Sequence, residues 1–263
     1  MFSIYLDPLI KTIQDSRIGC YIGNIPCNIA SYADDITILA ATVTVLRKLI
    51  DICEAYSKEF DVNFNLDKSK LMLFSNTILN KPIILVDNVV IEYVRHFKHL
   101  GNVFIDDDNI IDICEVVKEM KVKCNVICNE FKYLDTISRV HLFNTHCLSL
   151  YGCNLWNLKN DYMTRVNVEW RKCCRRILRL SPRTHCVLIP LLMNTPPIED
   201  IIHQRMINFF IAGLCHSNQN VKNLFRFLLL NNHSFLKSNI NWILNKNKIS
   251  YLSLFDGKKD QNK

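Results

Sequence analysis

Two adjacent aspartates between two short apolar runs constrain the fold of this chain more than any other feature. Asp34 and Asp35 follow residues 29–32 and precede residues 36–39, and both runs contain strand-favouring β-branched or aromatic residues. This arrangement predicts a β-hairpin with the two acids at its tip. Paired carboxylates are costly unless a cation offsets their charge, and a hard divalent cation such as Mg²⁺ is the usual partner. An ordinary turn is the alternative, because Asp often bonds its own backbone in turns.

Tyr32-Ala33-Asp34-Asp35 resembles the metal-binding hairpin of reverse transcriptases, and Ala33 is typical of the non-LTR retrotransposon and group II intron branches. The resemblance implies that Asp34, and after it Asp35, are catalytic residues and Mg²⁺ ligands, with two ions bound in full-length relatives. The implied function is RNA-directed DNA polymerisation, a two-metal nucleotidyl transfer to a primer 3′-hydroxyl. The implied partners are an RNA template, a DNA primer and deoxynucleoside triphosphates.

The residues after the hairpin follow the order of the same family. Apolar residues between Val45 and Phe60 recur at helical spacing and predict an amphipathic helix, which ends where Asp61 can adopt a left-handed turn. Residues 64–75 then resemble the Asn-x-x-Lys-Ser segment that precedes an apolar strand. By this resemblance Lys68 is the general acid that protonates the pyrophosphate leaving group. The alternative for Lys68 is a solvated loop lysine.

Residues 97–104 resemble the Phe-x-Tyr-Leu-Gly turn that grips the primer end, with His99 in place of Tyr. Leu100 and Gly101 are therefore the expected primer-grip residues. Gly101 also permits a tight turn or a close approach to the backbone. The resemblance covers residues 1–105 strongly and continues more weakly to about residue 215.

Residues 1–10 resemble the middle of a family helix that normally follows a Gly-rich turn. In full-length relatives the fingers, the first palm strand and a further metal-binding aspartate precede this helix. We therefore expect an N-terminally truncated fragment that is inactive alone, because two carboxylates on one turn do not fix two Mg²⁺ ions.

The pattern becomes helical from about residue 109, and three amphipathic helices are predicted before Pro182. Ser138 is expected to cap the second of them. The third, over residues 162–180, has a basic face, and its predicted nucleic-acid-binding residues are Arg171, Lys172, Arg175, Arg176 and Arg179. We expect this face to follow the phosphates of an A-like RNA–DNA duplex. A solvated basic surface is the alternative. A further helix is predicted over residues 198–214.

The predicted fold class is α+β. A partial polymerase palm, with an antiparallel sheet and helices, is expected over residues 1–105. An all-helical thumb-like region is expected over residues 106–215, and a weakly structured basic tail over residues 216–263. The chain has 263 residues, and its net charge of +7 favours a phosphate-rich partner.

The remaining composition concerns location. No secretory signal and no apolar run of bilayer length are visible, so no membrane association is expected. The 12 cysteines are scattered, which favours reduced thiols over a zinc site or a disulfide framework. We expect an intracellular protein, either nuclear or cytoplasmic. The sequence does not predict its oligomeric state.

Two other functional readings remain at this point. The first is a non-catalytic nucleic-acid-binding remnant that keeps the basic helix without the chemistry. The second is an α+β interaction protein in which Tyr-x-Asp-Asp occurs by chance.

Overall fold

The computed structural model describes residues 2–74, 81–106, 113–158, 162–232 and 234–250. The chain divides into two compact units. The first contains residues 1–97 and 218–227, and the second contains residues 98–217 and 228–263. Helices and short paired strands together confirm the predicted α+β class.

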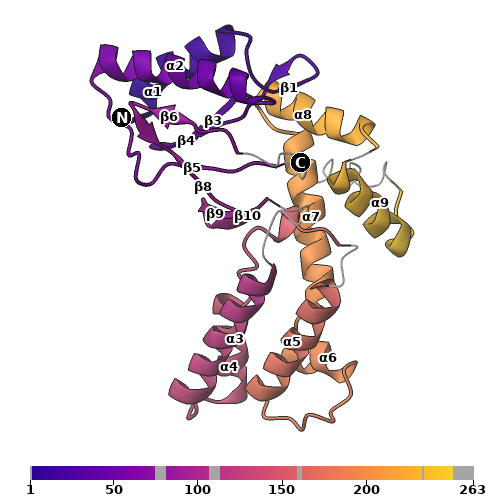
Figure 1. Cartoon of the computed structure of the whole chain (residues 1–263). Coiled ribbons are helices and arrows are strands. Elements are labelled where there is room, and N and C mark those ends of the chain that lie inside the picture. The colour runs from indigo at the N-terminus through magenta and orange to yellow at the C-terminus, as the bar shows by residue number, and fades with distance from the viewer. Residues whose placement is uncertain (1, 75–80, 107–112, 159–161, 233, 251–263) are drawn as a thin grey trace. The chain divides into compact units, whose positions relative to one another are not determined.

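Up to residue 97, the described part of the first unit contains two helices and eight short strands that lie wholly within it. These are α1 (Phe2–Asp15), β1 (Tyr21–Ile22), β2 (Ile25–Pro26), β3 (Ile29–Tyr32), β4 (Asp35–Ile38), α2 (Val43–Phe60), β5 (Lys70–Leu71), β6 (Leu85–Val86), β7 (Val89–Val90) and β8 (Glu92–Tyr93). The helices α1 and α2 lie side by side along the β3–β4 pair (Figure 1). Apolar side chains from these elements form the core: Leu6, Leu9, Ile13, Ile29, Leu49, Cys53 and Tyr56.

Helix α2 has clear signals at both ends. Thr42 caps its start, where its hydroxyl accepts a hydrogen bond from the Val45 N–H at 3.3 Å. Its end lies at Asp61, whose φ of 52° is left-handed. The predicted helix and the predicted left-handed Asp61 are both confirmed.

The strands form separate two-stranded pairs among the described residues, rather than one continuous palm sheet. Pairs β1–β2, β3–β4 and β6–β7 are antiparallel, whereas β5 pairs with β8 in parallel. Most of these strands are two residues long, and such short strands offer few hydrogen bonds to a further neighbour. The β3–β4 pair is therefore the main strand element that positions the acids.

The second unit is largely helical. Its elements are β9 (His96–His99), which begins at the unit boundary, β10 (Asn102–Ile105), α3 (Ile113–Glu130), α4 (Thr136–His146), the 3₁₀ turn η1 (Cys153–Leu155), α5 (Tyr162–Ile177), α6 (Leu188–Met193), α7 (Ile198–Leu214) and α9 (Phe235–Asn247). Helix α8 (Gln219–Leu230) belongs mostly to the first unit. The predicted helix over residues 198–214 is confirmed as α7.

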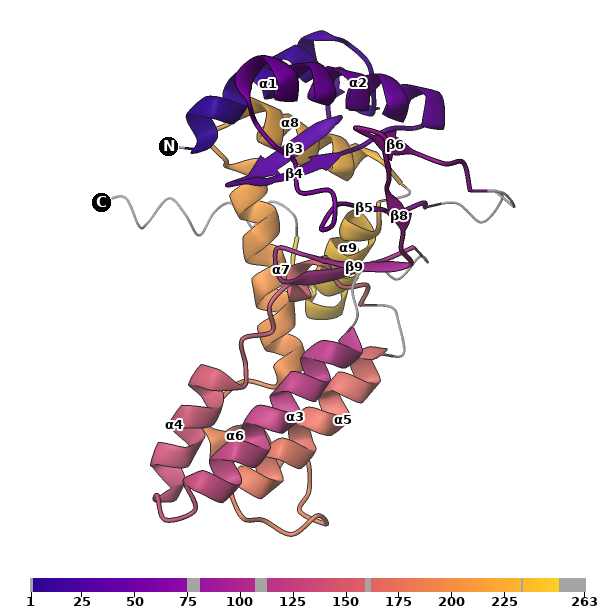
Figure 2. The ribbon, with the colours of Figure 1, turned by 60° about the vertical axis from the view of Figure 1, so that its left-hand side comes forward.

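Helices α3 and α5 lie side by side and run parallel (Figure 2). The residues in contact follow one another in the same direction along both helices. Lys121 pairs with Glu169 at 3.2 Å, and the sulfur of Cys124 lies 3.8 Å from the carbonyl oxygen of Cys173. The C-terminal ends of α3 and α5 therefore lie at the same end of the bundle.

Two predicted helix ends need correction. Asp135, rather than Ser138, caps α4: its carboxylate accepts the Ser138 N–H at 3.0 Å and the Ser138 hydroxyl at 2.6 Å. Helix α5 ends at Ile177 instead of residue 180, because Arg179 turns left-handed with φ of 54°. The start of the preceding helix, predicted near residue 109, lies outside the described residues.

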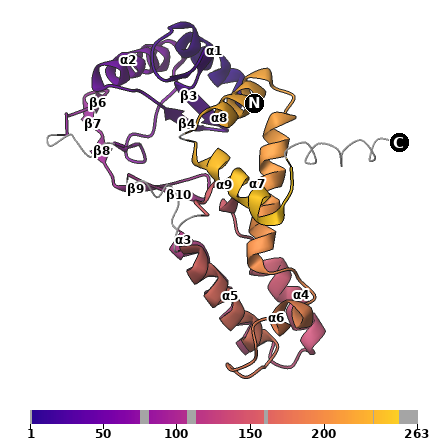
Figure 3. The same cartoon turned by 90° about the vertical axis from the view of Figure 1, so that its right-hand side faces the viewer.

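The prediction of a weakly structured tail from residue 216 is wrong for residues 219–247, which form α8 and α9. Leu236, Ile240, Ile243 and Leu244 repeat at helical spacing and are buried. Figure 3 shows α9 beside α7, a packing that His203 and Trp242 make directly with ring centroids 5.3 Å apart. The many Asn and Lys residues of this segment favoured the prediction of a weakly structured tail, because they separate the apolar residues of α9 along the sequence. Residues 251–263 lie outside the described residues.

The cysteines are all free thiols. Burial raises the pKa of Cys53 and of Cys147 to about 12, so both thiols stay protonated at neutral pH. Within the described ranges, no helix is both long enough and apolar enough to cross a bilayer.

His203 on α7 makes stability depend on pH. Its side chain is buried against Trp242, and desolvation lowers its pKa below 6.5, although Glu199 opposes the shift. Between the lowered folded pKa and 6.5, the unfolded chain binds more protons than the folded chain. The His203 contribution is thus present above pH 6.5 and is lost as pH falls through that window.

We expect urea unfolding to show a smaller free energy of unfolding at pH 5 than at pH 7.5. His203→Gln should reduce this difference, whereas His141→Gln, at an exposed position on α4, should preserve it. An unchanged pH dependence in His203→Gln would contradict this assignment.

Candidate functional site

The predicted hairpin is present. Strands β3 and β4 pair with Ile29 opposite Ile38 and Tyr32 opposite Asp35. Ala33 and Asp34 form the two-residue turn, and Asp35 is the first residue of β4. Both carboxylates are exposed at this tip, and the Tyr32 side chain is 67% exposed. The tip is therefore open to a ligand from solvent.

The base of the hairpin is fixed by Asn28, which the sequence did not single out. Its side chain is fully buried, and Nδ2 donates to the carbonyl oxygens of Ile13 at 3.0 Å and Ile18 at 2.7 Å. The backbone carbonyl oxygen of Asn28 accepts a hydrogen bond from the Leu39 N–H at 2.9 Å. Asn28 thereby ties both strands of the hairpin to the end of α1. No motif signals this role, because it depends on contacts across the fold.

Ala33 has a φ of 54° at the first position of the turn, where glycine is favoured. We expect Ala33→Gly to raise the free energy of unfolding by about 1 kcal/mol, because it relieves left-handed strain. Ala30→Gly, at an exposed position of β3, should instead lower it by roughly 0.5–1 kcal/mol. Chemical denaturation compares the two variants, and a destabilising Ala33→Gly would show that this turn is not strained.

Lys68 lies in an exposed turn before β5. Its backbone N–H donates to Asn65 Oδ1 at 3.1 Å, which organises the turn. Among the described residues, its side chain makes no hydrogen bond or ion pair. This exposure fits both a solvated lysine and a lysine that reaches a bound phosphate.

Leu100 and Gly101 form a two-residue turn between β9 and β10, with φ values of 47° and 80°. Positive φ at both positions is typical of a type I′ hairpin turn. A Cβ on Gly101 would lie 3.0 Å from Cε1 of Tyr151. The tight turn and the close approach predicted for Gly101 are both present, and the approaching group is the Tyr151 ring.

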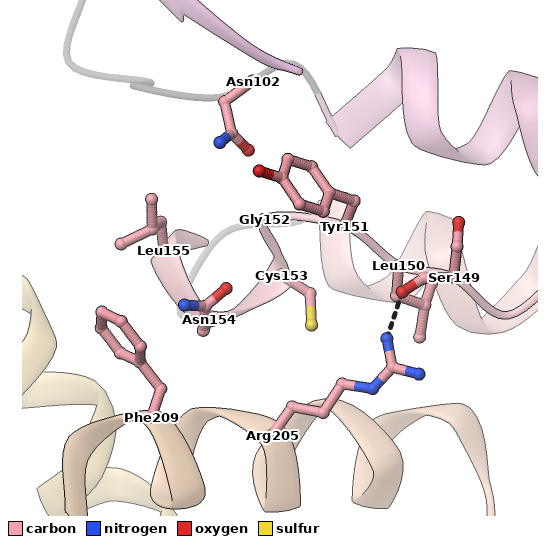
Figure 4. Close-up of a pocket in the computed structure, with 10 residues that line it drawn as sticks. All are labelled: Asn102, Ser149, Leu150, Tyr151, Gly152, Cys153, Asn154, Leu155, Arg205 and Phe209. Atoms are coloured by element: carbon pink, nitrogen blue, oxygen red, sulfur yellow. Dashed lines mark hydrogen bonds between the residues drawn. The ribbon is translucent and has the colours of Figure 1, made fainter. Parts of the chain in front are cut away.

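A cavity of about 330 Å³ lies beside this turn in the second unit (Figure 4). Arg205 on α7 organises its floor: its guanidinium donates to the carbonyl oxygen of Leu148 at 2.8 Å and to that of Ser149. Asn102 and Tyr151 lie close together on the opposite wall (Figure 4). The lining residues are Asn102, Ser149, Leu150, Tyr151, Gly152, Cys153, Asn154, Leu155, Arg205 and Phe209. Arg205 was missed in the sequence, because its partners are main-chain carbonyls more than fifty residues away.

The predicted basic residues on α5 and just after its end have different surroundings. Arg175 donates to the Thr184 carbonyl through Nε at 3.2 Å and Nη2 at 2.9 Å. Arg176 donates to Asn125 Oδ1, and Arg179 donates to the Lys132 carbonyl. Within the described residues, Arg175 therefore mainly holds the Thr184 carbonyl near α5.

Arg171 and Lys172 are less constrained. Lys172 is exposed and pairs with Glu169 at 2.8 Å. Arg171 is partly exposed and makes no hydrogen bond or ion pair within the described part of the chain. Both side chains can therefore contact an anionic partner, as can the donors that Arg176 and Arg179 retain.

Comparison with protein families decides the relationship. A family model described as reverse transcriptase (RNA-dependent DNA polymerase) matches residues 1–134, more than half of the chain. The chain belongs to the reverse transcriptase family. No curated protein gives a significant match. The matched residues include the Asp34–Asp35 hairpin, Lys68 and the Leu100–Gly101 turn, whereas α5 lies beyond them.

Reverse transcriptases are nucleotidyltransferases that act on a nucleic-acid template and primer with nucleotide substrates, and the family generally uses divalent metal ions. In this member of the family the hairpin tip presents the carboxylates of Asp34 and Asp35. Among the described residues, no group of three acidic, His or Cys side chains is arranged to hold a metal ion. Mg²⁺ commonly uses one or two carboxylates and retains several waters. The tip therefore fits one hydrated ion, but its donor set does not fit two.

Proposed function

We propose that this chain is part of an RNA-directed DNA polymerase of the non-LTR retrotransposon type. The observation that carries the proposal is the Tyr32-Ala33-Asp34-Asp35 hairpin, whose two carboxylates are exposed at its tip. The order of the Lys68 turn and the Leu100–Gly101 turn along the chain supports the same reading. The proposed partners are an RNA template, a DNA primer and deoxynucleoside triphosphates, and the proposed location is intracellular.

Each motif has a proposed role. Asp34 and Asp35 would hold Mg²⁺, which supplies positive charge that offsets a triphosphate when bound. Lys68 would donate a proton to the pyrophosphate leaving group. Leu100 and Gly101 would position the primer end through their backbone, and the basic face of α5 would contact duplex phosphates.

We further propose that the chain alone does not catalyse synthesis. Two carboxylates provide too few ligands to fix the two ions that in-line phosphoryl transfer uses. Mg²⁺ demands near-octahedral coordination, so one adjacent pair of acids leaves most positions to water. This small number of protein ligands supports metal binding without catalytic turnover.

Primer extension on an RNA template tests this proposal. The purified chain, Asp34→Ala and Asp35→Ala would be compared with Asp51→Ala, which alters an exposed acid on α2 away from the hairpin tip. We expect no synthesis that depends on Asp34. Robust extension lost in Asp34→Ala but kept in Asp51→Ala would overturn the proposed inactivity.

The second candidate function is nucleic-acid binding without catalysis. Between Tyr162 and Arg183 the only acidic residue is Glu169, and it is already paired with Lys121 and Lys172. The surrounding basic side chains favour a polyanionic partner. Hybrid binding without extension would support this candidate, whereas extension would support the polymerase.

A further inference from the structure

The segment between α3 and α4 exposes an unusual set of side chains. Tyr133 is 88% exposed, and Ile137 in the first turn of α4 is 83% exposed. Phe131 and Leu134 are also exposed. This tip, defined here as residues 131–137, presents apolar surface that the other described residues of its unit leave exposed. Such surface is commonly used for binding.

Cations flank the exposed ring of Tyr133. The Lys132 ammonium lies 4.9 Å from the ring centroid, within cation–π range. Arg179 donates a hydrogen bond to the Lys132 carbonyl, which brings a guanidinium from beyond α5 to the same place. Because α3 and α5 run parallel, their C-terminal ends meet here and Arg176 contributes a further charge through its bond to Asn125.

The acids near the tip offset this charge only in part. Asp135 carries a negative charge, but its carboxylate is engaged by the N–H and hydroxyl of Ser138 as the cap of α4. Glu130, the exposed last residue of α3, adds a second negative charge beside Phe131. Glu169 is engaged by Lys121 and Lys172. Lys132, Arg176 and Arg179 therefore outnumber Glu130 and Asp135 at the tip. A guanidinium has five N–H donors, so Arg176 and Arg179 retain donors after the bonds described.

This combination fits one kind of ligand best. An exposed aromatic ring beside Lys and Arg is the arrangement that holds single-stranded nucleic acid, because a base stacks on the ring while phosphates contact the cations. A lipid surface would favour a longer amphipathic face, and an acidic peptide would not require an exposed planar ring. Charge complementarity and the exposed ring together favour an unpaired nucleotide.

We propose that the tip is a platform for an unpaired nucleotide of RNA or DNA. The Tyr133 ring stacks on the base, and Lys132 and Arg179 contact the flanking phosphates. This inference rests on the proposed nucleic-acid function and extends it from duplex to single strand. It assigns a role to Lys132 and Tyr133, which lie outside the hairpin, the Lys68 turn and the predicted basic face, and it shares Arg179 with that face.

Fluorescence anisotropy with the full chain tests the platform. The probes are a blunt RNA–DNA hybrid, the same hybrid with a short single-stranded overhang, and that hybrid with an abasic overhang. We expect the base-bearing overhang to tighten binding by about 5-fold or more, since one stacked base contributes roughly 5- to 150-fold. The abasic overhang should lose most of this gain.

Variants separate stacking from charge. Tyr133→Ala should remove the overhang preference without changing the salt slope, whereas Tyr133→Phe should keep the preference. Val122→Ala, which alters an exposed apolar residue of α3 outside the tip, should leave both quantities unchanged. Lys132→Gln should lower the salt slope by about one unit if one phosphate contact is lost.

The outcomes distinguish the two proposals. Hybrid binding with an overhang preference that survives in Tyr133→Ala would overturn the platform alone. Absence of binding to every probe at low salt would overturn the proposed nucleic-acid function as well. Vesicles of phosphatidylcholine and phosphatidylserine provide a further arm: binding to them that depends on Ile137 and Tyr133 would identify the tip as a membrane surface and overturn the platform.

Discussion

Asn239→Ala is expected to lower the free energy of unfolding of the second unit by roughly 2–5 kcal/mol, because it orphans two buried backbone groups. Asn239 is fully buried on α9. Its Nδ2 donates to the Trp156 carbonyl at 2.7 Å, and its Oδ1 accepts the Leu158 N–H at 3.2 Å. One side chain therefore satisfies a donor and an acceptor of the same buried segment. Alanine replaces neither bond and leaves a space where the amide was.

Urea unfolding measured by far-UV circular dichroism gives the size of this effect. Asn245→Ala is the matched control, because Asn245 lies on the same helix and is exposed. We expect the control to change the free energy of unfolding by less than about 0.5 kcal/mol. Equal stability of the two variants would show that α9 is not integrated into the unit.

Gly101→Ala is the second large effect, with an expected loss of roughly 2–4 kcal/mol from left-handed strain and overpacking. At φ of 80° an L-residue is strained, and the new Cβ would lie 3.0 Å from Cε1 of Tyr151. Either the Leu100–Gly101 turn or the exposed Tyr151 ring has to move to make room for this Cβ. We therefore expect a local shift at this contact as well as lower stability.

Gly23 supplies a control that isolates strain. It has φ of 60° in the first unit, and a Cβ there would meet nothing within 4 Å. Gly23→Ala should cost only the strain of about 1–2 kcal/mol. In a Tyr151→Leu background the cost of Gly101→Ala should fall toward the Gly23→Ala value. Equal costs for Gly101→Ala and Gly23→Ala in the wild-type background would contradict the proposed clash.

The parts of this fold that sequence reasoning anticipated are local. Apolar spacing identified α2, and the turn preference of Asp identified its left-handed end at Asp61. The hairpin around Asp34 was predicted from two strand-like runs that a short polar segment separates, and β3 and β4 form it. In each case the determining contacts lie within a few residues of one another, so a sequence window contains them.

The parts that were missed depend on distant partners. Asn28 and Asn239 look like loop asparagines, yet each is buried because backbone groups from another element need its amide. Arg175 fell on the predicted basic face, but the Thr184 carbonyl occupies its guanidinium. Helical spacing gives the direction of a side chain and cannot give the partner that a later loop brings to it.

We propose that this member of the reverse transcriptase family binds nucleic acid, with phosphate contacts from α5. The most direct test of this claim is the affinity for an RNA–DNA hybrid as a function of salt, for the wild-type chain and for Arg171→Gln/Lys172→Gln. Lys118→Gln is the matched control, because Lys118 is an exposed cation on α3 that pairs with Glu115. We predict that the logarithm of the affinity falls linearly with the logarithm of salt, and that the slope decreases by about two in the double variant alone. An unmeasurable affinity at low salt, or a slope that the double variant leaves unchanged, would contradict the claim.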